Sequence, residues 1–217
     1  MRAAWLAVPA LAVAMAAHAE SGPALEVDFT NPGLTPAHWV LTLSPEGNGH
    51  FRSERGNAAK DKSQGFEAAD VDRDINVSAE FAQHVFETAR QSKFFNIGCE
   101  SHMKVAFSGW KKLSYSGPDG AGSCTFNYSK DKEIQTLGES LVAVAGSIVE
   151  GARLETLLQH DRLGLDRETE YVVEAAKDGR LQQMCTIKGI LQRLADDPEV
   201  MDRVRKRARV LLARADG

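Results

Sequence analysis

Apolar and polar residues alternate with a period of two through most of the chain between Ala24 and Tyr128. Turn-forming segments at 31–33 and 45–49 separate three early runs, and this pattern is typical of strands with one buried face. Three further runs follow Cys99, with the apolar sets Met103, Val105 and Phe107; Leu113 and Tyr115; and Cys124, Phe126 and Tyr128. A glycine-rich turn at 117–122 joins the last two runs, so we expect a second group of strands there.

Helical periodicity interrupts the strands once and later replaces them. Residues 78–93 carry an apolar stripe behind Ser78, a residue type that caps helix amides. The last part of the chain predicts a helix from Asp131 to Leu158 if Gly146 and Gly151 do not interrupt it, one from Asp166 to Gly179, one over 180–195 and one starting at Asp197. The pattern therefore predicts an α+β fold: a small antiparallel sheet in two strand groups with a helix between them, followed by an all-helical C-terminal third.

The C-terminal helices carry one resemblance to a known family. Residues 191–198, followed by Val204, Arg205, Ala208 and Leu211, resemble a single unit of a HEAT-type helical repeat. Such repeats bury their cores by stacking several units, and the chain holds no second clear copy, so a plain helical hairpin is the alternative. The sheet region resembles exported bacterial domains of unknown function, and this resemblance implies no particular site.

The N-terminus predicts export. Met1 and Arg2 form a short positive start, residues 3–16 are an apolar run interrupted by Pro9, and residues 17–19 (AHA) have the small-x-small pattern that signal peptidase reads. Neither this run nor any later stretch is long enough to span a bilayer. We therefore expect residues 1–19 to be a signal peptide, 20–130 a sheet-plus-helix region, and 131–217 a helical region that could form one compact unit with the sheet, in a periplasmic or secreted protein.

Export changes the interpretation of the three cysteines, Cys99, Cys124 and Cys185, because all three would meet an oxidising compartment. One disulfide and one spare thiol is the simplest arrangement, and three pairings are possible. We favour Cys99 with Cys124, since Cys99 comes just before a predicted strand and Cys124 lies in one nearby. Cys185 is then expected to be a small buried residue beside Leu181 and Met184.

Charge and motifs exclude several classes of function. The chain has 26 Lys and Arg against 30 Asp and Glu, and a net charge of −4 argues against nucleic-acid binding. It contains no G-x-S-x-G, H-E-x-x-H, C-x-x-C or glycine-rich phosphate-binding motif, so no cofactor is predicted. Residues 70–74 (DVDRD) imitate the start of a calcium loop, but Ile75 and Phe81 stand where glycine and a bidentate acid are needed. Alternating acids on the exposed face of a strand are the better interpretation, and we predict no metal site.

Two polar groups in the helical region have both a functional and a structural interpretation. His160, Asp161 and Asp166 could form a general base with its orienting carboxylate, although helix capping explains the acids equally. The last helix contains Arg203, Arg205, Lys206, Arg207, Arg209 and Arg214. These cations could meet an acidic partner or an anionic lipid surface, or they could simply be the solvated face of the helix.

The strongest candidate binding surface is formed by Trp110, Lys111, Lys112 and Tyr115 with the turn at 117–122. An exposed aromatic beside two lysines suits a polymer or the edge of a peptide, whereas a Trp110 that fills the core is the alternative. We therefore expect an exported soluble protein, most simply a non-catalytic one that binds a protein or polymer partner. The alternative is an exported hydrolase whose site is assembled from dispersed residues such as His102 or the pair His160 and Asp161.

Overall fold

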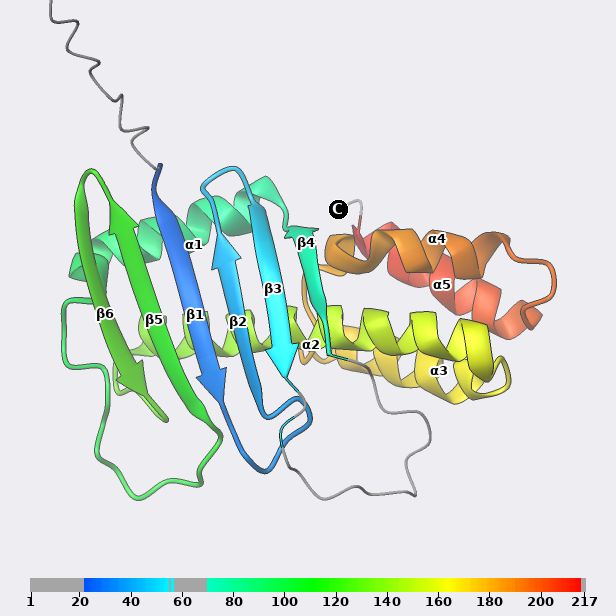
Figure 1. The fold of residues 1–217 in the computed structure, drawn as a ribbon, viewed down its shortest axis with the longest axis horizontal. Coiled ribbons are helices and arrows are strands. Elements are labelled where there is room, and N and C mark those ends of the chain that lie inside the picture. The colour runs from blue at the N-terminus through cyan, green and yellow to red at the C-terminus, as the bar shows by residue number, and fades with distance from the viewer. Residues whose placement is uncertain (1–21, 55, 57–69, 216–217) are drawn as a thin grey trace, which may run out of the picture.

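The computed structural model describes residues 22–54, 56 and 70–215, so the predicted signal peptide at 1–19 lies outside the described residues. The strands are β1 (Ala24–Thr30), β2 (His38–Leu43), β3 (Asn48–Glu54), β4 (Asp72–Asn76), β5 (Trp110–Gly117) and β6 (Gly120–Phe126). They form one six-stranded sheet in the order β4-β3-β2-β1-β5-β6, and every neighbouring pair is antiparallel. The two predicted strand groups thus join through β1 and β5, as Figure 1 shows.

The helices are α1 (Ala79–Gln91), α2 (Lys132–His160), α3 (Gly164–Lys177), α4 (Lys188–Asp196) and α5 (Asp202–Ala215), with short 3-10 turns η2 (Lys93–Phe95) and η3 (Met184–Ile187). Two of the expected helix starts are capped by side chains, because the first amides of a helix have no partner within it. Ser78 Oγ accepts from the Phe81 amide, and Asp131 Oδ1 accepts from the Glu133 amide. The predicted α+β fold with a helical C-terminal part is confirmed.

The sheet buries one face and leaves the other polar. Leu25, Val27 and Phe29 of β1 point inward, and the Phe29 ring stacks on Trp39 of β2 with 5.0 Å between centroids. Helices α1 and α2 both lie behind this face in Figure 1 and complete the first core. The opposite face presents alternating polar residues, as a period of two requires when one face packs and the other meets water.

Helix α2 belongs to two hydrophobic cores. Its first half packs under the sheet, and its last turns, from Leu154 onward, pack with α3, α4, α5 and η3 in a second cluster. Gly151 lies between the two, where a Cβ atom would collide with the Ile187 side chain, so this glycine permits the close approach of η3 rather than breaking the helix. Arg73 of β4 donates two hydrogen bonds to the Glu155 carboxylate of α2, at 2.8 and 3.2 Å, and this ion pair also links sheet and helices.

Three expected helix boundaries in the C-terminal part are wrong. Helix α3 starts at Gly164, so Asp166 lies inside its first turn instead of capping it. The side chain before the helix that accepts from its first amide is Asp161, whose Oδ1 accepts from the Gly164 amide. The third helix starts at Lys188, after a left-handed residue at Gln183, rather than at 180. Helix α5 starts at Asp202 rather than Asp197. In each case local hydrogen bonds to side chains or turns compete with continuation of the helix.

Candidate binding surface

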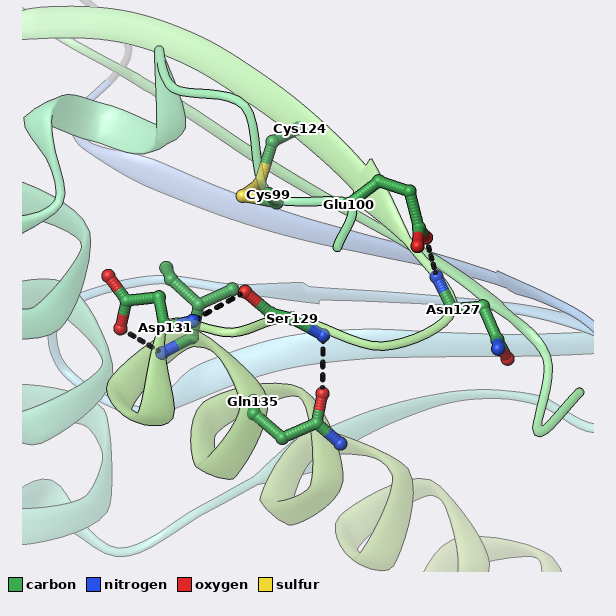
Figure 2. The surroundings of a disulfide bond; sticks show 8 residues. Cys99, Glu100, Cys124, Asn127, Ser129, Asp131 and Gln135 are labelled. Atoms are coloured by element: carbon green, nitrogen blue, oxygen red, sulfur yellow. Dashed lines mark hydrogen bonds between the residues drawn. A yellow bond between two sulfur atoms is a disulfide. The ribbon is translucent and has the colours of Figure 1, made fainter. Parts of the chain in front are cut away.

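A disulfide between Cys99 and Cys124 joins the segment after α1 to the last strand of the sheet, with 5.8 Å between the two Cα atoms. Figure 2 shows the bond beside the strand that carries Cys124. The predicted pairing is confirmed. Residues 100–109 connect Cys99 to Trp110 at the start of β5. The disulfide therefore fixes the beginning of this segment.

The expected strand through Met103, Val105 and Phe107 is wrong. Residues 102–108 have no regular secondary structure, and all of them are exposed. The backbone is not extended, since His102 has φ of +53° and the Val105 amide donates to the Met103 carbonyl at 3.0 Å. The free edge of β6 is covered by η2, and just past the end of the strand the Ser101 amide donates to the Tyr128 carbonyl. A further strand therefore has no free edge to pair with at this place.

Asn127 holds both ends of this loop. Its amide donates to Glu100 Oε2 at 2.7 Å, as Figure 2 shows, and its side chain donates to the Ala106 carbonyl and accepts from the Ser108 amide. The Glu100 carboxylate also accepts from the His102 amide. These backbone donors, with Asn127 the largest contributor, lower the pKa of Glu100, so its carboxylate is ionised and directed at the loop's own backbone.

Lys111 lies beneath the loop instead of on its surface. Its ammonium donates to the carbonyls of Asn127 and Gly109 and to Ser108 Oγ, at 3.0 to 3.3 Å, and stands 5.4 Å from the Phe126 ring centroid. Burial lowers the pKa of this lysine. All three ammonium protons have acceptors, so Lys111 supports the end of the loop and is not available to a ligand.

Gly109 closes the loop against the sheet. Its φ of +117° is a conformation that side chains rarely permit, and a Cβ atom here would collide with the edge of the Phe29 ring. The glycine thus lets the backbone pass directly over the core. With the disulfide, Asn127 and Lys111, it fixes the loop at both ends while residues 102–108 stay exposed.

The four predicted binding residues divide between the two faces of β5. Trp110 and Lys112 lie on the exposed face, and the alternative in which Trp110 fills the core is wrong. Lys111 and Tyr115 lie on the buried face, where the Tyr115 hydroxyl donates to Asp119 Oδ1 at 2.5 Å. Because side chains alternate along a strand, these two residues share the face of Leu113 and cannot belong to an exterior surface with Lys112.

Large apolar side chains gather on the loop and the strand that follows it. Met103 is 51% exposed, Val105 40%, Phe107 52% and Trp110 46%. The Phe107 and Trp110 rings meet edge to face, with 5.9 Å between centroids. Figure 1 shows the loop extending past the end of the sheet beside β5 and β6. We call these four residues the apolar loop surface. The sequence pattern predicted an apolar face here but contained no signal that this face is uncovered.

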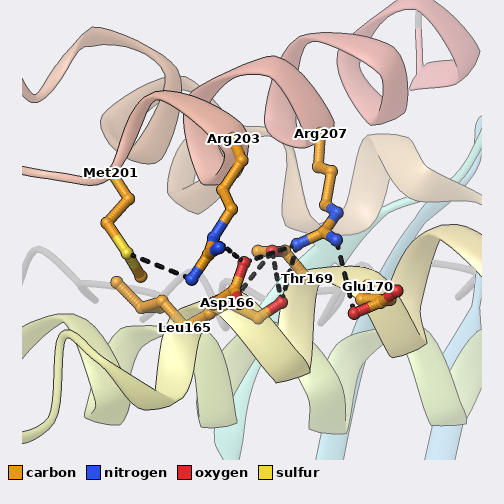
Figure 3. A network of polar contacts seen from close by, with 7 residues as sticks. All are labelled: Leu165, Asp166, Thr169, Glu170, Met201, Arg203 and Arg207. Atoms are coloured by element: carbon orange, nitrogen blue, oxygen red, sulfur yellow. Dashed lines mark hydrogen bonds and ion pairs between the residues drawn. The ribbon is translucent and has the colours of Figure 1, made fainter.

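The other sequence candidates have structural partners. Asp161 caps the turn into α3, and the Asp166 carboxylate pairs with Arg203 at 2.6 Å and Arg207 at 2.8 Å, as Figure 3 shows. Arg209 and Arg214 donate to the carbonyls that end α4 and α3. Four basic residues of α5 therefore attach that helix to its neighbours, whereas Arg205 and Lys206 pair with Asp202 of α5 itself. The acids expected near His160 hold a helix end and a helix pair together.

The histidines remain scattered, and no group of His, Cys, Asp and Glu within the described residues could hold a metal ion. On the exposed sheet face, His50 lies between Asp72 and Asp74, at 3.0 and 2.9 Å. The hydrogen bond with Asp74 is the largest cause of its raised pKa. Asp72 and Asp74 point outward while Val71 and Ile75 are buried, which agrees with the strand interpretation of residues 70–74.

Cys185 is half-buried in η3 and donates a weak hydrogen bond to Gln183 Oε1 at 3.5 Å. Burial raises the pKa of its thiol, so the reactive thiolate is disfavoured. It borders a pocket of about 320 Å³ between the start of α1 and the end of α5. The expectation of full burial is thus met only in part.

Comparison of the sequence with known proteins does not assign the chain to a family. No protein-family model matches the chain, and no curated protein matches it. Among the described helices, none is long and apolar enough to cross a membrane. Any function must therefore be argued from the geometry of the molecule.

Proposed function

We propose that this chain is an exported, non-catalytic binding protein and that the apolar loop surface is its contact with a partner. The observation that carries the proposal is the exposure of Met103, Val105 and Phe107 on one fixed loop, with Trp110 at the start of the strand that follows it. Keeping large apolar side chains in water is unfavourable, and clustered exposure of this kind marks interaction sites. A loop ordered before binding also loses less conformational entropy on contact.

Export is supported by the disulfide as well as by the N-terminal pattern. Cys99 and Cys124 are both buried and bonded within the first core, and such bonds persist in oxidising compartments. Cleavage before Glu20 would release a chain that begins just before β1. The periplasm or the cell exterior is the compartment we propose.

The hydrolase alternative has weaker support. His102 lies in the loop, where the nearby Glu100 carboxylate is already hydrogen-bonded to backbone amides. His160 ends α2, where the neighbouring Asp161 side chain caps a turn. In both places the carboxylate that neighbours the histidine in the chain already has a structural role, which weakens its candidacy as the partner that orients a general base.

Photo-crosslinking tests the binding surface in cells that export the chain. Benzoylphenylalanine replaces Phe107 in one variant and Leu163 in the matched control, since Leu163 is also exposed but lies between α2 and α3. We expect irradiation to give adducts at position 107 and none at position 163. Equal labelling at both positions, or none at 107, would show that the apolar loop surface is not the contact.

A further inference from the structure

Two exposed lysines, Lys104 and Lys112, lie beside the apolar loop surface, and Lys112 stands across the strand pair from Asp28 of β1. From His102 to Lys112 the chain contains three lysines and no acid. Lys104 and Lys112 are exposed, whereas Lys111 is buried beneath the loop. The nearest acid before the loop, Glu100, has its carboxylate bound to backbone amides. A partner that covers this surface must therefore accept apolar side chains and cations together.

The shape of the loop narrows the class of partner. A peptide strand needs an extended edge with free amides and carbonyls in register, and the turn around Lys104 and the left-handed His102 interrupt such an edge. The loop instead presents side chains beyond the end of the sheet. Methionine, valine and phenylalanine point outward with tryptophan at the base, and tryptophan favours the level of lipid headgroups.

We propose that the apolar loop surface docks on an anionic phospholipid bilayer. This inference rests on the proposed binding function and names its partner. Met103, Val105 and Phe107 enter the boundary between headgroups and acyl chains, while Trp110 stays at the headgroup level. Lys104 and Lys112 meet the lipid phosphates, because long cationic side chains reach polar groups from beside an apolar surface. The fixed base of the loop presents these groups together.

Vesicle binding of the chain purified after export tests the proposal. Two vesicle types are used: phosphatidylcholine alone, and two parts phosphatidylcholine with one part phosphatidylglycerol. We expect sedimentation with the mixed vesicles and a blue shift of tryptophan fluorescence. Trp39 is buried, so the shift reports Trp110 and should disappear in Trp110→Phe. Added salt should weaken the binding because it screens Lys104 and Lys112.

Paired double variants locate the contact. Val105→Ser with Phe107→Ser should reduce the affinity for mixed vesicles roughly tenfold or more, since it removes two apolar side chains from the contact. Leu163→Ser with Val210→Ser removes two exposed apolar side chains elsewhere and should leave the affinity unchanged. Thermal unfolding of both variants should match the parent chain, because none of the four side chains is buried.

The results separate the lipid inference from the binding function. No binding to mixed vesicles, or binding that survives the loop double variant, would overturn the lipid inference. If vesicles fail while position 107 still crosslinks to a protein, the partner is a protein with an apolar pocket and an acidic rim, and the binding function stands. If vesicles fail and position 107 gives no adduct, both proposals are wrong.

Discussion

Replacing Glu150 by glutamine should make the protein more stable at alkaline pH. Glu150 of α2 faces Glu168 of α3, and Arg153 lies 3.0 Å from the Glu168 carboxylate. Burial, followed by the hydrogen bond and repulsion from Glu168, raises the pKa of Glu150 from 4.5 to about 8, while Arg153 lowers it. The pair therefore shares a proton at neutral pH, because two adjacent buried carboxylates cannot both ionise without a large penalty.

The sign of the pH dependence follows from this raised pKa. Between pH 4.5 and about 8 the folded protein keeps a proton on Glu150 that the unfolded chain has released, so the contribution of this group to stability is greatest below pH 4.5 and falls as the pH rises through about 8. Each pH unit corresponds to about 1.4 kcal/mol, which gives at most about 5 kcal/mol over the whole interval. Glutamine is neutral at every pH and can still donate a hydrogen bond to Glu168. The E150Q variant should therefore not lose this stability as the pH rises.

Urea unfolding followed by circular dichroism at pH 5 and pH 8 measures the effect. We expect E150Q and the parent chain to differ little at pH 5, and E150Q to be more stable by several kcal/mol at pH 8. The matched control Glu174→Gln changes an exposed acid on α3 and should alter stability by less than about 0.5 kcal/mol at either pH. An E150Q protein that loses as much stability as the parent between the two pH values would refute the argument.

Three further predictions concern the loop and its supports. Cys99→Ser with Cys124→Ser should lower the free energy of unfolding by about 3.5 kcal/mol, the chain-entropy value for a separation of 25 residues, and unchanged denaturation would contradict it. Asn127→Ala removes the hydrogen bonds to the Ala106 carbonyl and the Ser108 amide and should cost about 0.5–1.5 kcal/mol, with faster amide exchange at Ser108. Gly109→Ala should destabilise the fold and shift the NMR signals of the Phe29 ring, whereas an undisturbed ring would show that the backbone can relax.

Some features that depend only on neighbours in the chain were predicted correctly, although the helix starts expected at Asp166 and Asp197 were not. Ser78 and Asp131 cap helices because the amides they accept from lie only a few residues ahead. The alternation in β1 to β3 and the turns between them define a meander by themselves, since each strand pairs with the next. The same alternation in β5 could have separated Lys112 from Lys111 and Tyr115, because the latter two share a face with Leu113.

Long-range contacts decided the rest. A period of two at residues 103–107 predicts an apolar face but cannot tell whether another element covers it, and the free edge of β6 was already covered by η2. The pKa of Glu150 is raised only because α3 packs against α2 and brings Glu168 beside it. The period of apolar residues and the helix caps involve residues that are close together in the chain, so the sequence alone can predict them. The exposure of a side chain and the pKa of a buried acid depend on which residues from distant parts of the chain pack against it. Only the tertiary structure determines these contacts.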